Sequence, residues 1–279
     1  MIVTAVDYTY LRREGTYLIK SCWKHAPEQR FYLYLVNAPK EIDAELNQWH
    51  GNIIVEHREY PVSPETWKGV MCCARTIPLQ HVLHKYREPT IYLDSDVIVK
   101  RPLTQLFSLL EQHDLAVLLR EQSRIVGPLG TEHAYKFNSG VIGIKPSPYG
   151  LEFVQRYCDF IQTKIKAGAA IDHTDQGVYT ALDQEYLYVL YQEMSDRIKF
   201  QALSETFNDS EFKPGSVVWH GKGNTRSQYV YKREKADYDA NYSKYIFYSG
   251  VSHAQATLER GKRKLKSIIL RKNSTKAAI

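Results

Sequence analysis

Short apolar runs alternate with longer segments of helical periodicity along most of this chain, and this alternation limits the possible folds more than any other feature. Several runs, such as 31–36, are too continuously apolar for a strand with one face in water. Strands that alternate with helices in this way favour a mostly parallel sheet covered by helices on both sides, an α/β fold. The expected strands are 1–6, 31–36, 52–60, 90–99, 114–120, 141–144 and 216–219, and the expected helices are 15–25, 65–86 with a kink at Pro78, 104–112 and 149–166.

Charge is distributed unevenly along the sequence. The chain has 37 Lys and Arg against 31 Asp and Glu, a formal net charge of +6. Eight of the basic residues and one acid lie in residues 259–276, which leaves 29 basic against 30 acidic residues elsewhere. A near-neutral body does not support a nucleic-acid-binding surface. We therefore predict a globular domain over 1–250 and a basic tail over 251–279, with no specific nucleic-acid partner.

The tail combines its positive charge with an apolar stripe at helical spacing. This pattern predicts a basic amphipathic helix, which could lie on an anionic membrane surface, pack on the body or stay solvated. Tyrosines that precede it, Tyr238 among them, could add contacts at a membrane interface. The four cysteines have no C-x-x-C spacing, and no apolar run is long enough to span a bilayer. We expect a cytoplasmic protein, peripheral on the inner face of the membrane if the tail binds there.

The strand expected at 90–99 carries two carboxylates, Asp94 and Asp96, separated by Ser95. In parallel α/β sheets, ligands bind at the carboxyl ends of strands. Carboxylate oxygens suit magnesium or manganese, ions that commonly link a protein to substrate phosphates. A second D-x-D at 237–239 follows no strand and is interpreted as solvated surface. A loop expected over 123–137 is long enough to be functional.

Five spaced motifs resemble those of retaining, nucleotide-sugar-dependent glycosyltransferases of the GT-A fold. The closest pattern is that of glycosyltransferase family 8, which contains glycogenin-like and lipopolysaccharide galactosyl- and glucosyltransferases. The resemblance covers about residues 1–226. The matching segments, in the family's order, are Ala5-Val-Asp7-Tyr-Thr-Tyr10, Arg75 before the D-x-D strand, Phe137-Asn138-Ser139-Gly140, Asp175-Gln176-Gly177 and His220-Gly-Lys222-Gly223-Asn-Thr-Arg226. The chain departs from the family in having Arg226 where lysine is usual, Ser227-Gln228 in place of Pro-Trp, and Cys73 where a tyrosine often stands.

The resemblance implies a role for each of these residues. Asp94, Asp96 and His220 would bind the metal, and the imidazole ligand favours Mn²⁺ over Mg²⁺. Asp175 and Gln176 would line the reacting face as catalytic residues. The donor-binding residues would be Ala5, Asp7 and Tyr10 for the uracil, Arg75, Asn138, Ser139 and Gly140 for the sugar and phosphate, and Asp94, Ser95, Lys222, Gly223 and Arg226 for the metal-bound diphosphate.

The expected function is transfer of a hexose, such as glucose or galactose, from a UDP-sugar to a saccharide or glycolipid acceptor. The resemblance implies retention of configuration, with the leaving phosphate acting as the base, whereas an inverting enzyme would need a carboxylate base on the acceptor hydroxyl. A sugar-nucleotide pyrophosphorylase shares the architecture but needs a Gly-rich basic loop after the first strand, where 7–10 reads Asp-Tyr-Thr-Tyr. A non-catalytic carbohydrate- or membrane-binding protein would keep the fold but would not need three metal ligands.

Overall fold

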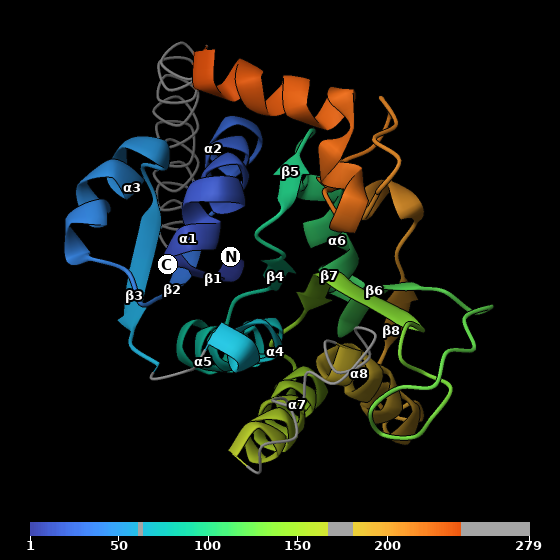
Figure 1. The fold of residues 1–279 in the computed structure, drawn as a ribbon. Coiled ribbons are helices and arrows are strands. Elements are labelled where there is room, and N and C mark those ends of the chain that lie inside the picture. The colour runs from blue at the N-terminus through green and yellow to red at the C-terminus, as the bar shows by residue number, and fades with distance from the viewer. Residues whose placement is uncertain (61–63, 167–180, 241–279) are drawn as a thin grey trace, which may run out of the picture.

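A seven-stranded sheet with the strand order β3-β2-β1-β4-β7-β6-β8 forms the centre of the molecule (Figure 1). The computed structural model describes residues 1–60, 64–166 and 181–240. All neighbouring strands pair in parallel except β7, which is antiparallel to both β4 and β6. The strands are β1 (Ile2–Asp7), β2 (Phe31–Val36), β3 (Ile53–Arg58), β4 (Thr90–Leu93), β6 (Leu115–Leu119), β7 (Phe137–Ile144) and β8 (Phe200–Ala202). The expected mostly parallel sheet is confirmed.

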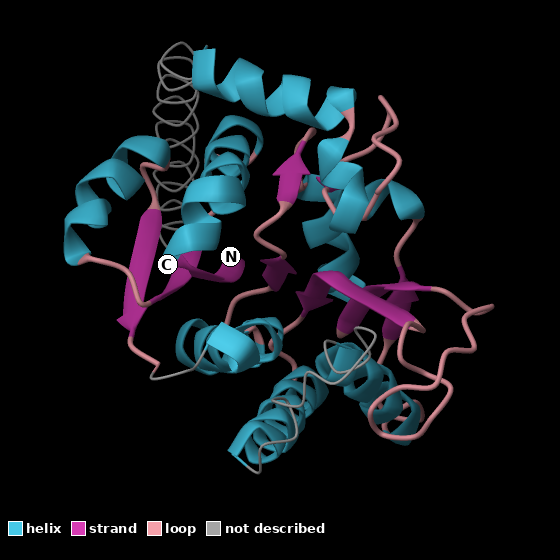
Figure 2. Cartoon of the chain, viewed as in Figure 1, coloured by secondary structure: helices cyan, strands magenta, loops and turns pink. Residues whose placement is uncertain are grey.

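Helices cover both faces of this sheet (Figure 2). Alternate side chains of β2 enter two separate cores: Phe31, Leu33 and Leu35 enter one, and Tyr32 and Tyr34 enter the other. Burial on both faces explains why this strand is a continuous apolar run. The first core is closed by α2 (Thr16–His25), α3 (Asp43–Trp49) and α6 (Thr104–Gln112), and the second by α4 (Pro64–Ala74), α5 (Thr76–Tyr86), α7 (Pro148–Lys166) and α8 (Leu182–Glu193).

The strand expected over 90–99 divides into two strands in different sheets. β4 ends at Leu93, and β5 (Val97–Val99) pairs with β9 (Val218–His220) in a two-stranded antiparallel sheet. The polar residues between β4 and β5 form a turn, in which the Val97 N–H donates to the Asp94 carbonyl over 3.2 Å. This turn holds the D-x-D sequence at the carboxyl end of β4, beside β9 and its terminal residue His220.

The long helix expected over 65–86 is broken at Arg75 into α4 and α5. The expected kink at Pro78 is wrong, because Pro78 lies in the first turn of α5. A first-turn residue needs no intrahelical N–H bond, so proline is tolerated there. The break instead occurs where the Arg75 side chain turns towards the sheet.

The second D-x-D, at 237–239, lies on a helix, and its expected surface position is confirmed for Asp239, which is exposed, whereas the tyrosine between the two acids is not. Residues 229–240 are helical, and Tyr238 is fully buried with Trp23 and Tyr231. Asp239 accepts a hydrogen bond from the Tyr17 hydroxyl over 2.9 Å. Tyr238 therefore serves the core and is not available to a membrane interface.

One strand begins earlier than expected, and two helices were not expected. β7 begins at Phe137, four residues before the expected strand, so the Phe-Asn-Ser-Gly motif belongs to the sheet. The helices α3 and α8 had not been expected, whereas α6 matches its expected range.

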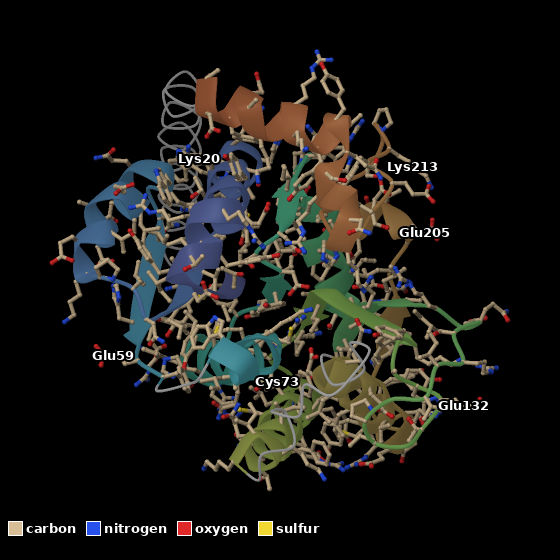
Figure 3. The ribbon with its side chains drawn as sticks, in the orientation of Figure 1. Lys20, Glu59, Cys73, Glu132, Glu205 and Lys213 are labelled. Carbon is tan, nitrogen blue, oxygen red and sulfur yellow. The ribbon has the colours of Figure 1, made fainter. Side chains whose placement is uncertain are left out.

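Side chains fill the layers, with Cys73 inside and Glu59, Glu132 and Lys213 at the periphery (Figure 3). No helix within the described ranges is long and apolar enough to cross a membrane. The predicted tail, 251–279, and the Asp175-Gln176 pair lie outside the described residues.

Candidate active site

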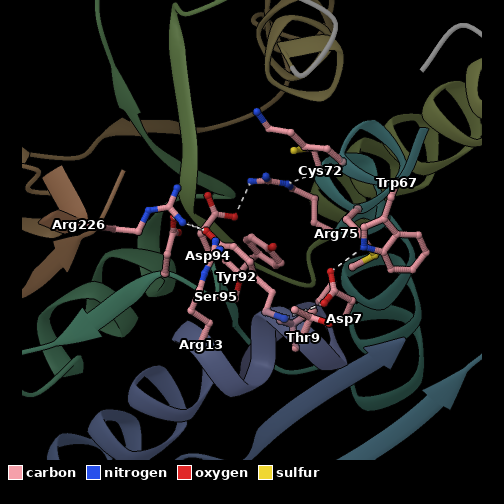
Figure 4. A pocket seen from close by; sticks show the side chains of 16 residues that line it. Asp7, Thr9, Arg13, Trp67, Cys72, Arg75, Tyr92, Asp94, Ser95 and Arg226 are labelled. Carbon is pink, nitrogen blue, oxygen red and sulfur yellow. Dashed lines mark hydrogen bonds and ion pairs between the residues drawn. The ribbon is translucent and has the colours of Figure 1, made fainter. Parts of the chain in front are cut away.

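A cleft of about 600 Å³ opens at the carboxyl ends of β1 and β4 (Figure 4). Parallel strands direct their carboxyl ends to one edge of a sheet, so polar residues that follow different strands meet there. Trp67 of α4 and Arg226 complete its walls. The predicted residues that line the cleft are Ala5, Asp7, Tyr10, Arg75, Asp94, Ser95, Asp96 and Arg226.

Asp94, Asp96 and His220 converge beside this cleft. One ligand atom from each residue lies within 4.8 Å of the other two. The His220 Nε2 atom is 3.3 Å from Asp96 Oδ1 and 3.7 Å from Asp94 Oδ2. Burial opposes ionisation of Asp96, but the nearby His220 and Arg226 outweigh it, and the pKa of Asp96 lies below its usual range. Two carboxylates and one imidazole within this distance fit a divalent cation.

Asn208 fixes the orientation of the His220 ring. His220 Nδ1 lies 2.7 Å from Asn208 Oδ1, and the Asn208 amide nitrogen in turn donates to the Asn138 carbonyl over 3.4 Å. That second bond sets the amide so that its oxygen faces the ring. Nδ1 then carries the proton, and the Nε2 lone pair is directed towards the two carboxylates. Asn208 was missed in the sequence, where no motif distinguishes it.

Gly140 supplies the space that the His220 ring occupies. A Cβ atom added at Gly140 would lie 2.4 Å from Cε1 and 2.6 Å from Nδ1 of His220. The Gly140 carbonyl also accepts a hydrogen bond from the Asp94 N–H over 2.9 Å. The register of β6 on β7 shifts beside this residue, between Val117 and Leu118. The glycine of the Phe-Asn-Ser-Gly motif is thus explained by close approach of a metal-ligand candidate.

Arg75 links the metal-ligand candidates to the sheet interior. Its buried guanidinium is 3.0 Å from Asp94 Oδ1 and 3.1 Å from Asp183 Oδ2. It also donates to the Ser139 carbonyl over 2.7 Å. Burial raises the pKa of Asp183 despite the arginine. Arg75 was predicted to contact the donor. Its ion pair with Asp94 gives it a second role, which is to hold the Asp94 carboxylate in place.

Asp183 and the adjacent Gln184 are functional candidates that the sequence interpretation missed. The Gln184 side-chain oxygen accepts from the Ser139 N–H over 3.1 Å, and its amide donates to the Ala134 carbonyl over 2.9 Å. This Asp-Gln pair therefore contacts the Phe-Asn-Ser-Gly strand directly. The signal was present, since the same dipeptide occurs at Asp175-Gln176 and again here, at the start of an apolar helix. Asp175 and Gln176 themselves remain predictions.

Asp7 caps α1 (Tyr8–Tyr10) and anchors the opposite wall of the cleft. One carboxylate oxygen accepts from the Tyr10 N–H over 2.7 Å, and the other accepts from the Trp67 indole N–H over 2.7 Å. Trp67 was not predicted, because nothing in the sequence near it marks it as part of this site. The Tyr10 hydroxyl lies 3.3 Å from Asp96 Oδ2, and the Arg13 guanidinium lies 4.5 Å from the Tyr10 ring centroid. This wall offers aromatic surface beside a carboxylate.

Two basic residues follow β9, Lys222 and Arg226, and they lie in different places relative to the cleft. The Arg226 guanidinium donates to the Tyr10 hydroxyl and stands 4.0 Å from Asp96. Lys222 is exposed, although the surrounding walls desolvate its ammonium and, with Arg120 nearby, lower its pKa. Gly223 has φ +56°, a left-handed conformation that lets the chain turn back between them. Of the two cations, Arg226 lines the cleft.

Tyr231 supports the backbone of Asp96 from the helical segment 229–240. Its buried hydroxyl donates to the Asp96 carbonyl over 2.9 Å, and the Gly221 N–H donates to the same oxygen over 2.8 Å. Lys235 of the same helix pairs with the buried Glu14 over 3.0 Å. The helix is therefore tied to the candidate site by direct hydrogen bonds.

The sheet order, the cleft and the carboxylate pair define a GT-A fold, and comparison with solved structures agrees. The apo form of the glycosyltransferase GlyE of Streptococcus pneumoniae TIGR4 superposes with a TM-score of 0.59 at 19% identity, covering 90% of this chain and 63% of that chain. An active-site mutant of LgtC superposes with a TM-score of 0.52 at 17% identity, covering 84% of this chain and 94% of that one. At these identities the likeness establishes the fold.

Similarity at the level of sequence covers a smaller part of the chain than the structural similarity does. No family model matches it. A mouse protein, glucoside xylosyltransferase 2, is 33% identical over 95 residues, which cover 30% of this chain. The match spans about a fifth of that relative's length, 21%.

Proposed function

We propose that this protein transfers a hexose from a UDP-sugar to a saccharide or lipid-linked acceptor in a metal-dependent reaction, with retention of configuration. The observation that carries the proposal is the convergence of Asp94, Asp96 and His220 beside a cleft at the carboxyl edge of the sheet. The GT-A fold shared with GlyE and LgtC supports the same class of reaction.

The cleft has suitable chemistry for each part of a UDP-sugar. Asp7, Tyr10 and Trp67 would receive the base, with the Asp7 carboxylate accepting its N–H and the two rings packing against it. The guanidinium groups of Arg226 and Arg13, which line the cleft, would contact the diphosphate. Asn138, Ser139 and Gly140 lie where their backbone could contact the sugar, next to Arg75 and Gln184.

Asp94, Asp96 and His220 would hold the cation, and the imidazole makes manganese the better choice over magnesium. When bound, such a cation would stabilise the negative charge that develops on the departing diphosphate. Asn208 keeps His220 in the tautomer that a metal requires, and Arg75 and Tyr231 keep the two aspartates in place. These are preorganised contacts, so no large rearrangement of the ligand set is needed.

A screen of UDP- and GDP-sugars tests this function. We expect one UDP-hexose to raise the melting temperature in the presence of Mn²⁺ and to release UDP, and chelation to abolish both effects. A pyrophosphorylase would instead form a nucleoside triphosphate from the nucleotide sugar and pyrophosphate, and a non-catalytic binder would release no UDP. If no nucleotide sugar shifts the melting curve, the donor-site assignment is wrong.

We extend the proposal to the basic segment 251–279, which would bring the cleft to lipid-linked acceptors on an anionic membrane. Its charge and apolar periodicity support this placement. Full-length protein is expected to float with vesicles rich in anionic lipid and to remain unbound with neutral vesicles. Changing Arg263, Lys264 and Lys266 to glutamine should weaken binding about a hundredfold, at about 1 kcal/mol for each residue. Absence of flotation with anionic vesicles would refute the placement.

A further inference from the structure

Two cations stand at the same edge of the sheet as the candidate site but outside its cleft. Arg120 directly follows β6, which runs parallel to β4 through the intervening antiparallel β7. It therefore emerges at the edge where Asp94 follows β4. Lys222 follows β9 and comes two residues after His220. Arg13, Lys68, Arg75 and Arg226 line the cleft, whereas Arg120 and Lys222 do not.

Both cations adjoin Tyr135. The Lys222 ammonium lies 5.6 Å from the Tyr135 ring centroid. The backbone N–H of Arg120 donates to the backbone carbonyl of Lys136, the residue after Tyr135, over 2.7 Å, which places the Arg120 backbone beside this loop. The positive charge of Arg120 acts on Lys222, as do the negative charges of Asp94 and Asp96. The two positive groups and one aromatic ring thus border a single region on the β6 side of the metal-ligand candidates.

Neither cation forms an ion pair with an acid in the part of the chain that the structure describes, and both are exposed. This distinguishes them from Arg75, which pairs with Asp94 and Asp183, and from Arg226, which lies 4.0 Å from Asp96. The negative charges of Asp94 and Asp96 act on Lys222 without forming an ion pair with it, and Arg120 adds a second positive charge beside it. Two neighbouring positive charges attract an anion. An arginine can bind phosphate or carboxylate through two parallel hydrogen bonds, and a lysine adds a point charge.

The loop that carries Tyr135 is fixed by a buried acid from α8. Glu185 accepts hydrogen bonds from the N–H groups of Leu129, over 2.8 Å, and Thr131, over 3.2 Å. A Cβ atom at Gly127 would approach Glu185 Oε2 to 2.3 Å, so the glycine lets the loop close on that carboxylate. Gln184 holds the Ala134 carbonyl. These bonds give the wall beside the two cations a defined shape.

We propose that Arg120 and Lys222 form a subsite for an anionic group, a phosphate or a carboxylate, carried by the acceptor saccharide, with Tyr135 packing against the sugar beside it. This inference rests on the proposed function and narrows its acceptor class. The donor cleft already has cations of its own for the diphosphate, so the additional pair serves the second substrate.

Titration calorimetry on the full chain, saturated with UDP and Mn²⁺, tests the subsite. The probes are glucose 6-phosphate and glucuronate as anionic sugars, and glucose as the neutral control. We expect both anionic sugars to bind at least tenfold more tightly than glucose. Arg120→Gln and Lys222→Gln should each weaken the anionic sugars about tenfold, and Arg120→Gln should leave the affinity for UDP within about twofold.

Arg124→Gln is the matched control, because this exposed arginine of the same loop bonds only to the local carbonyls of Glu121 and Ser123 among the described residues. It should change none of the affinities. Equal binding of glucose and glucose 6-phosphate would overturn the subsite. A loss of UDP affinity in Lys222→Gln, with anionic sugars unaffected, would assign the lysine to the donor instead.

Failure of the proposed function gives a different result. If UDP does not bind the wild-type protein, the donor site is wrong, and the anionic sugars are then titrated into the protein alone. Tighter binding than glucose that is lost in Arg120→Gln would still support an anion subsite. Binding that is equal in wild type and variant would refute it. Because both side chains are exposed, melting curves of the variants should match that of the wild type.

Discussion

Replacing Asp96 by asparagine is expected to lower the kcat/KM for release of UDP from the preferred UDP-hexose about a thousandfold, equivalent to about 4 kcal/mol. Asp96 is one of three groups whose ligand atoms lie within 4.8 Å of one another. The amide removes one negative charge from the ligand set and weakens metal binding. Manganese affinity, measured by electron paramagnetic resonance, should fall together with the rate.

The second D-x-D provides the matched control for this change. Asp239→Asn makes the same chemical substitution at a carboxylate that pairs with Tyr17 and Lys20 on the surface of another helix. It should leave the rate and the manganese affinity within about twofold, since exposed pairs contribute little. If Asp96→Asn keeps wild-type manganese affinity, Asp96 is not a metal ligand, whatever the effect on the rate.

Replacing Arg75 by methionine should lower the free energy of unfolding by about 4 kcal/mol. The change leaves the buried Asp183 without its cationic partner, 3.1 Å away, and leaves Asp94 without its partner at 3.0 Å. An uncompensated buried carboxylate is costly, and protonation of Asp183 would relieve only part of that cost. Chemical denaturation followed by circular dichroism measures the loss.

A double variant separates the lost ion pair from the lost packing. Adding Asp183→Asn to Arg75→Met removes the unpaired charge and should recover part of the stability, which a double-mutant cycle quantifies. Arg156→Met is the control, because Arg156 pairs with Glu152 and Glu193 on the surface. Its cost should stay within about 1 kcal/mol. An equally small cost for Arg75→Met would mean that the Arg75 pairs do not support the site.

Much of the candidate site could be predicted because its residues occur in short contiguous motifs. Asp94 and Asp96 interrupt an apolar strand, and His220 ends a strand and precedes two nearby glycines. Such motifs specify the local conformation of the backbone, and they can be recognised in a single sequence because their residues are contiguous. The same reasoning failed for the helix break, because Pro78 is compatible with a first turn and the ion pairs of Arg75 come from residues distant in the sequence.

Asp183 shows why sequence alone could not choose between two identical dipeptides. Asp175-Gln176 and Asp183-Gln184 are equivalent as patterns, yet contact with Arg75 and Ser139 distinguishes the second pair. Trp67, Asn208 and Tyr231 were missed for a related reason. Each acts through hydrogen bonds that form only in the folded chain, and such bonds leave no periodicity or motif.

The sequence by itself determined the layered α/β architecture and the presence of a carboxylate pair at a strand end, because hydrophobic periodicity and strand termination are local properties. Only the tertiary structure decided which groups surround that pair. The contacts of Arg75 with Asp183, of His220 with Gly140, and of Lys222 with Tyr135 join segments far apart in the sequence. Packing and electrostatics in the folded chain selected those partners, because each contact requires several elements to be in place at once.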